Sequence, residues 1–243
     1  CCYCCSLMNK LKNWDNKTWL SSKEYIKSFH NFLKRKITID QDTKILDVGC
    51  GRANIISYLN LKYKFKFKPI GLDIVKNDKI KKNITFKNIN AINYLNKSNE
   101  IFDLIIVKQT IHFFREKDLF FFLNLIKKRL TKKGKVFIFM LNNKNNEIPT
   151  FKLMEQQLKK SLEKDKKIAK KIKKKLKNYE SDYFRFTVSV NKSKYIQMIK
   201  NRYISCLLNL SEKHLKNGIK EIKTKYNKKI KFKDILNCIS YKN

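Results

Sequence analysis

The stretch at residues 44–53 reads Lys-Ile-Leu-Asp-Val-Gly-Cys-Gly-Arg-Ala. Its first half is an apolar run of the kind that forms a buried parallel strand. Gly49 and Gly51 then interrupt the run, and apolar residues return at helical spacing over residues 55–59. A strand, a glycine turn and a helix start let a ligand approach the backbone closely and contact the unpaired N–H groups of the helix. The sequence therefore predicts a ligand site at this turn.

The acid inside this run, Asp47, indicates the kind of ligand. A dinucleotide-binding loop has a further glycine three positions after its second one, and this chain has none three positions after Gly51. A carboxylate beside the turn suits a ligand with a positive end better than it suits a pyrophosphate. A nicotinamide-dependent oxidoreductase stays an alternative, although it would need the missing glycine at its phosphates.

This turn resembles the first motif of the class I S-adenosylmethionine-dependent methyltransferases, and the chain looks like a type 11-like domain of that family. The resemblance implies S-adenosylmethionine as cofactor, with Asp47, Gly49 and Gly51 holding its methionine end. Ala53 stands where the family usually has a third glycine. Because alanine is small and tolerates a helical backbone, we expect a slightly tighter fit there and no loss of binding.

A second acid, Asp73, lies in the strand predicted at residues 69–74. It follows the first glycine turn by a little more than about twenty residues, which places it at the tip of the neighbouring parallel strand. There its carboxylate can accept hydrogen bonds from both hydroxyls of a ribose. A capping or loop acid is the alternative, but the occurrence of Asp47 at this spacing favours the ribose role. We assign the next residue, Ile74, to the same cofactor site.

A third strand is predicted at residues 84–89, and Asn90 and Ala91 follow it. In the family an acid often stands at the position of Asn90 and accepts a hydrogen bond from the adenine amino group. Asn90 can still accept through its side-chain oxygen. The resemblance therefore implies that Asn90 and Ala91 contact the adenine, and a polar loop residue in an asparagine-rich chain is the alternative.

Three polar residues, Lys108, Gln109 and His112, follow the strand predicted at residues 102–107. Open parallel sheets bind ligands beyond the carboxyl ends of their strands, so these residues are candidates for the substrate side. The stretch resembles the family's fourth motif, and we also assign Lys108 to the cofactor site. His112 is our candidate catalytic residue, because it can orient a nucleophile or take its proton. A packing or capping histidine is the alternative for a residue without an evident partner.

The remaining periodicities complete the fold class. They predict a helix over residues 118–130, a turn ending at Gly134, a strand over 136–141, and later strands near 184–190 and 235–241. We therefore predict an α/β fold, a Rossmann-like doubly wound and mostly parallel seven-stranded sheet with helices on both faces. Residues 8–243 would form a single domain, with residues 142–195 as a helical cap or insertion.

The N-terminal region carries a capping box and several aromatic residues. Ser21 and Glu24 have the spacing of a capping box that opens a helix. Trp14, Trp19 and Tyr25 are candidates for a lid over the cofactor, and packing against the sheet is the alternative for each.

Four of the seven cysteines, at positions 1, 2, 4 and 5, crowd the start of the chain, ahead of the first methionine, Met8. We interpret residues 1–7 as a non-native or disordered leader and predict no metal site, since zinc usually needs two separated ligand pairs. Nothing in the cysteine pattern indicates disulfides, so we expect the cytoplasm as the compartment.

The chain has 243 residues and a formal net charge of +37. Such a charge is typical of nucleic-acid-binding proteins, but lysine, asparagine and isoleucine are over-used throughout. We therefore favour a small-molecule acceptor. The alternatives are an RNA or protein methyltransferase, or a nucleic-acid-binding protein without catalysis. No apolar run in the sequence is long enough to span a membrane.

Overall fold

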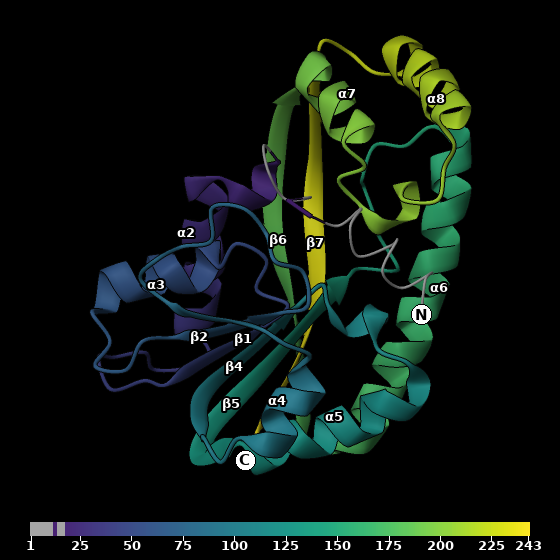
Figure 1. The fold of residues 1–243 in the computed structure, drawn as a ribbon. Helices are drawn as coiled ribbons and strands as arrows, with labels where there is room; N and C mark the ends of the chain where they lie inside the picture. Colours follow the sequence, from purple (N-terminus) through teal and green to yellow (C-terminus); the bar gives the residue numbers. More distant parts are fainter. Residues whose placement is uncertain (1–11, 14–17) are drawn as a thin grey trace.

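The computed structural model describes residues 12–13 and 18–243. Its seven strands form one sheet in the order β3-β2-β1-β4-β5-β7-β6 (Figure 1). The strands are β1 Ile45–Val48, β2 Ile70–Asp73, β3 Thr85–Asn88, β4 Phe102–Lys108, β5 Leu130–Leu141, β6 Tyr179–Asn191 and β7 Lys229–Lys242. The helices are η1 Trp19–Ser21, α2 Lys23–Lys34, α3 Asn54–Tyr63, α4 Ala91–Lys97, η2 Ile111–Phe113, α5 Glu116–Lys128, α6 Lys152–Leu176, α7 Lys192–Lys200, η3 Ser205–Leu207 and α8 Glu212–Lys225.

The first five strands of the sheet pair in parallel, and β7 runs antiparallel to both β5 and β6. The mostly parallel seven-stranded sheet predicted from the sequence is therefore confirmed. Because β1, β2 and β4 are parallel neighbours, their carboxyl ends meet at one edge of the sheet.

Two hydrophobic cores cover the two faces of the sheet. Leu104 and Ile106 of β4 pack in the core that contains α2 and α3, whereas Ile105 and Val107 pack in the core that contains α4 and α5. All four side chains are fully buried, and each contributes about 1.5–3 kcal/mol of burial free energy. Burial on both faces explains why this strand is a continuous apolar run with no polar alternation.

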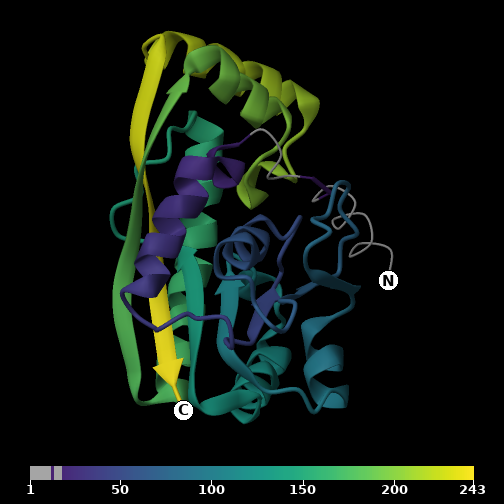
Figure 2. The ribbon, with the colours of Figure 1, turned by 90° about the vertical axis from the view of Figure 1, so that its left-hand side faces the viewer.

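Strands β6 and β7 extend well past the rest of the sheet. Residues 236–242 of β7 pair with β5, but residues 229–235 pair with β6 alone. Both views show this two-stranded arm rising from the sheet with α7 and α8 at its far end (Figures 1 and 2). Within the described residues, no helix combines the length and the apolar character needed to cross a membrane.

The long helix α6 connects the sheet to the end of this arm. Its C-terminal half buries Ile168 and Ile172 in the core that contains α4 and α5. Its N-terminal half buries Met154 and Leu158 in the other core, together with residues of α7 and α8. The helix therefore places side chains both on the sheet and beyond its carboxyl edge.

The predicted capping box is wrong by one residue. Ser22 caps α2 by accepting a hydrogen bond from the N–H of Tyr25 at 3.2 Å, while Ser21 belongs to η1 and donates to the carbonyl of Thr18. The short 3-10 turn takes up the residue that the sequence pattern placed at the cap. Trp19 and Tyr25 are both buried, so packing is the role the structure gives them, and Trp14 lies outside the described residues.

Two further boundaries differ from the sequence prediction. Helix α5 starts at Glu116, and β5 starts at Leu130 with a bulge, because Phe102 pairs with Leu130 but Leu104 pairs with Lys135. The predicted turn is thus an irregularity inside a longer strand. The N-terminal cysteines and the predicted leader lie outside the described residues.

Candidate functional site

The two glycines of the turn after β1 have different roles. Both have left-handed backbones, with φ of +73° at Gly49 and +56° at Gly51. A Cβ atom added to Gly49 would lie 2.0 Å from Oγ1 of Thr110, so the loops after β1 and β4 touch there. A Cβ atom added to Gly51 would meet no described atom within 4 Å. Gly49 therefore serves packing, and Gly51 leaves open space beside the backbone.

Ala53 also has a left-handed backbone, with φ of +60°, directly before α3. The helical backbone expected for this alanine is therefore wrong. Its methyl group is fully buried, and the conformation that glycine adopts freely costs an alanine about 1–2 kcal/mol. Gly49, Gly51 and Ala53 thus all have left-handed backbones in this turn.

The carboxylate of Asp73 fixes the turn to the end of β2. Its Oδ2 accepts a hydrogen bond from the N–H of Gly51 at 2.8 Å, and its Oδ1 accepts one from the N–H of Val75 at 2.9 Å. The acid at the predicted position thus holds the glycine turn in place at the end of β2.

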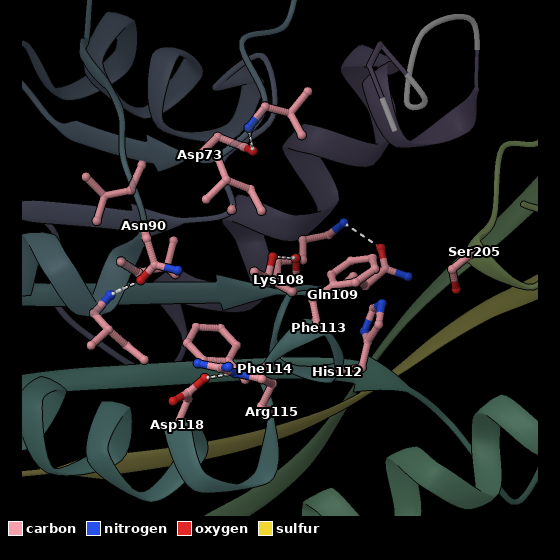
Figure 3. Close-up of a pocket in the computed structure, with 18 of the residues that line it drawn as sticks. Asp73, Asn90, Lys108, Gln109, His112, Phe113, Phe114, Arg115, Asp118 and Ser205 are labelled. Atoms are coloured by element: carbon pink, nitrogen blue, oxygen red, sulfur yellow. Dashed lines mark hydrogen bonds and ion pairs between the residues drawn. The ribbon is translucent and has the colours of Figure 1, made fainter. Parts of the chain in front are cut away.

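A cavity of about 450 Å³ lies beyond the carboxyl ends of β1, β2 and β4 (Figure 3). Of the residues predicted for the site, those lining it are Gly49, Asp73, Ile74, Asn90, Ala91, Lys108, Gln109 and His112. Asp47 and Gly51 do not line it. One end of the cavity reaches α4, and the other reaches α6 and η3.

Asn90 caps α4, because its Oδ1 accepts a hydrogen bond from the N–H of Ile92 at 2.9 Å. The residue therefore has the capping role and also lines the cavity, next to Ala91. Asn90 and Asp73 lie toward the same end of the cavity in Figure 3, away from His112.

Asp47 is buried in β1, with 3% of its surface exposed. Loss of solvent raises the pKa of its carboxyl to about 7, with Lys108 opposing the shift and Asp73 adding to it. Lys108 donates a hydrogen bond to Oε1 of Gln109 at 3.1 Å and lies 5.1 Å from the ring centre of Tyr25. Asp47 is thus a desolvated carboxylate with the cation of Lys108 near it.

His112 stands in η2 with its Nε2 buried and without a hydrogen-bond partner among the described residues. Burial, with a smaller effect of Lys164, lowers the pKa of its imidazole to about 4. The ring is therefore neutral near pH 7 and is a weak base. Its assignment as the catalytic residue stays a prediction.

Sequence reasoning missed the far wall of the cavity, which includes Ser161, Asp165, Ile204 and Ser205. Asp165 lies on the buried side of α6 between Leu162 and Ala169. An acid inside the apolar stripe of a helix was the available signal. No sequence signal indicated the serine of η3, since the chain fold alone brings it to the site.

The known proteins that resemble this chain include methyltransferases. A family model described as a methyltransferase domain matches residues 39–201. A search among curated proteins finds no match. The chain is similar to an S-adenosylmethionine-dependent methyltransferase from Geobacter sulfurreducens, solved with S-adenosyl-L-homocysteine, at a TM-score of 0.57 and 11% identity over 96% of each chain. It is also similar to the plantazolicin methyltransferase BpumL, solved with SAH, at a TM-score of 0.53 and 15% identity over 95% of this chain and 88% of the other.

Proposed function

Because the chain belongs to the methyltransferase-domain family, whose model matches residues 39–201, we propose that it transfers the methyl group of S-adenosylmethionine to a small-molecule acceptor. The observation that carries the proposal is the turn after β1. Its left-handed glycine backbone is bonded to Asp73 and leaves open space at Gly51, where a ligand can approach the main chain. The enclosing wall of α6 and η3 supports an acceptor of small size.

Asp47 fits the methionine end of this cofactor. Its carboxylate has lost its solvent, and a ligand amino group near the turn would restore a favourable charge interaction. Gly51 leaves open space beside the backbone, Gly49 lines the cavity, and Lys108 provides the cation that suits the ligand's carboxylate. These assignments keep the roles that the sequence suggested for the turn, although Asp47 and Gly51 are not among the residues that line the cavity.

Asp73 and Asn90 fit the nucleoside end. The carboxylate of Asp73 is a hydrogen-bond acceptor that suits ribose hydroxyls, while Ile74 offers an apolar surface beside it. Asn90 already accepts from the N–H of Ile92, so an adenine amino group would share its oxygen. We therefore expect Asn90 to contribute less to affinity than Asp73 does.

S-adenosylmethionine supplies a methyl group that is activated by its sulfonium charge. The chain's own task is then to bind donor and acceptor in line and to exclude water, which needs no strong acid–base pair. The neutral His112 at the cavity is consistent with a positioning role of this kind.

Calorimetry with S-adenosylhomocysteine, NAD and NADP tests the proposal. We expect binding of S-adenosylhomocysteine and far weaker binding of both dinucleotides. Asp73→Ala should weaken S-adenosylhomocysteine binding by about 1–3 kcal/mol, because ligand hydroxyls lose a charged acceptor. Asp42→Ala is the matched control. Asp42 is exposed, forms an ion pair with Lys66 at 2.6 Å, and is not among the residues that line the cavity. Equal affinities of the two variants would refute the ribose assignment.

A further inference from the structure

Two buried polar atoms at the far end of the cavity have no hydrogen-bond partner among the described residues. They are Oδ1 of Asp165 and Nε2 of His112, and both residues line the cavity. Asp165 has only 5% of its surface exposed. Buried polar atoms in proteins are nearly always paired, so two unpaired ones at the same cavity indicate a ligand that the protein binds there.

The two atoms come from elements that the structure ties together. Asp165 lies on α6 and His112 on η2, and Nζ of Lys164 donates a hydrogen bond to the carbonyl of His112 at 3.2 Å. Ser161 lies one helical turn before Asp165 and also lines the cavity. In Figure 3, His112 and Ser205 lie on the side opposite Asp73 and Asn90, so this end is distinct from the nucleoside end.

The charges around this end limit what it can bind. Lys164, the cation nearest to Asp165, donates to a backbone carbonyl, and Arg115 is paired with Asp118 at 2.6 Å. Burial raises the pKa of Asp165 to about 6, against the effect of Lys164, so the group is mainly ionised near pH 7. A carboxylate only accepts hydrogen bonds when it is ionised, so its ligand must donate.

Resting on the proposed function, we infer that this end of the cavity binds the methyl acceptor, and that the acceptor is an amine or an N–H heterocycle that donates to Asp165 and His112. Leu141, Phe113 and Ile204 line the same cavity and give an apolar contact surface for a carbon skeleton. A carboxylate or phosphate at this position would meet the negative charge of Asp165. Asp165 is thus the residue that selects the acceptor's charge.

The same carboxylate completes the proton balance of the reaction. The acceptor nitrogen forms a bond to the methyl carbon with its lone pair, and the carbon–sulfur bond breaks with its electron pair on the sulfur. The methylated nitrogen then carries a positive charge and releases its proton to the carboxylate of Asp165. His112 is a positioning residue here, because its neutral ring is the weaker base.

Methyl transfer into a metabolite extract tests the acceptor class. The full chain is incubated with radiolabelled S-adenosylmethionine and a small-molecule extract, and labelled products are separated by ion exchange and identified by mass spectrometry. We expect a neutral or cationic N-methylated product. An anionic product, or no product from a chain that binds S-adenosylhomocysteine, overturns the inference. Failure to bind S-adenosylhomocysteine instead overturns the proposed function.

Variants of Asp165 test the residue itself. Asp165→Asn and Asp165→Leu should each lower labelled product formation by about tenfold or more, since a charged acceptor is lost, and leave S-adenosylhomocysteine affinity unchanged. Asp165→Leu should also raise the melting temperature, because it removes a buried unpaired carboxylate. Glu163→Gln is the matched control on the exposed side of the same helix, where Glu163 lies 3.8 Å from Lys166. A lower melting temperature with equal losses of affinity and rate would show a structural role and contradict the inference.

Discussion

The two ends of the cavity are built in different ways. The end proposed for the cofactor uses the backbone of the turn after β1, held by Asp73 through bonds to main-chain N–H groups. The far end uses side chains of α6, η2 and η3, which come from three separate parts of the chain. A site formed by the backbone of one turn therefore produces a local sequence motif, whereas a site assembled from side chains of distant segments does not. The difference also predicts that the two ends respond differently to substitution.

The largest effect is expected where backbone geometry and packing coincide. Gly49→Ala should destabilise the chain by about 3–5 kcal/mol, because the new methyl group overlaps Thr110 and the backbone is left-handed. Gly51→Ala should cost only about 1–2 kcal/mol of stability, since open space receives its methyl group. Yet that variant should lose affinity for S-adenosylhomocysteine. Urea denaturation measures the stability of each variant, and calorimetry measures its affinity for S-adenosylhomocysteine. Similar stability losses in the two variants would contradict the different roles given to Gly49 and Gly51.

A second prediction separates stability from binding at Asp47. Its pKa is about 7 in the folded chain and about 3.8 unfolded, so ionisation disfavours the folded state. The penalty is absent below pH 3.8, grows as pH rises, and is complete above pH 7. Asp47→Asn should therefore stabilise the chain by about 4 kcal/mol at pH 8 and by almost nothing near pH 4. Denaturation across this pH range measures the effect.

The same Asp47→Asn variant should bind S-adenosylhomocysteine more weakly, because it lacks the charge opposite the ligand amino group. A variant that is less stable at pH 8 would contradict the desolvation argument. A variant that binds equally well would remove Asp47 from the cofactor end, and the comparison would then rest on Asp73 alone.

The smallest effect concerns the outer side of α6. Replacing Lys170, Lys171 and Lys174 by Gln should leave methyl transfer and stability almost unchanged, because only Lys171 has an ion-pair partner among the described residues, the exposed Glu116. Any RNA binding by the unmodified chain should be insensitive to sequence and disappear near physiological salt. Filter binding over a salt series measures this. Tight, salt-resistant binding that the three substitutions abolish would instead favour the RNA alternative.

Sequence reasoning placed Asp47 and Asp73 on neighbouring parallel strands because their signals are local. The apolar run before Gly49 and the spacing from Asp47 to Asp73 place both acids at neighbouring strand ends, as the sheet order shows. It missed the backbone of Ala53, since alanine seldom adopts a left-handed conformation and the loop imposes it.

The far end was missed for a different reason. Asp165 interrupts the apolar side of a lysine-rich helix, but the sequence does not show that this part of the helix lines the cavity. Ser205 reaches the site through the placement of η3, which contacts α6. Neither placement follows from periodicity within a segment, so tertiary packing decides both.

The length of the β6–β7 arm sets the distance of α7 and α8 from the rest of the sheet. The arm's seven β7 residues beyond β5, at positions 229–235, pair with β6 alone, so a change in its length leaves the parallel strands untouched. Each added residue pair would lift α7 and α8 by about 3.4 Å. Because side chains alternate between the two faces, only additions of two pairs keep the same residues facing inward. Two added residue pairs would thus raise α7 and α8 by about 7 Å and leave the residues of the glycine turn as they are.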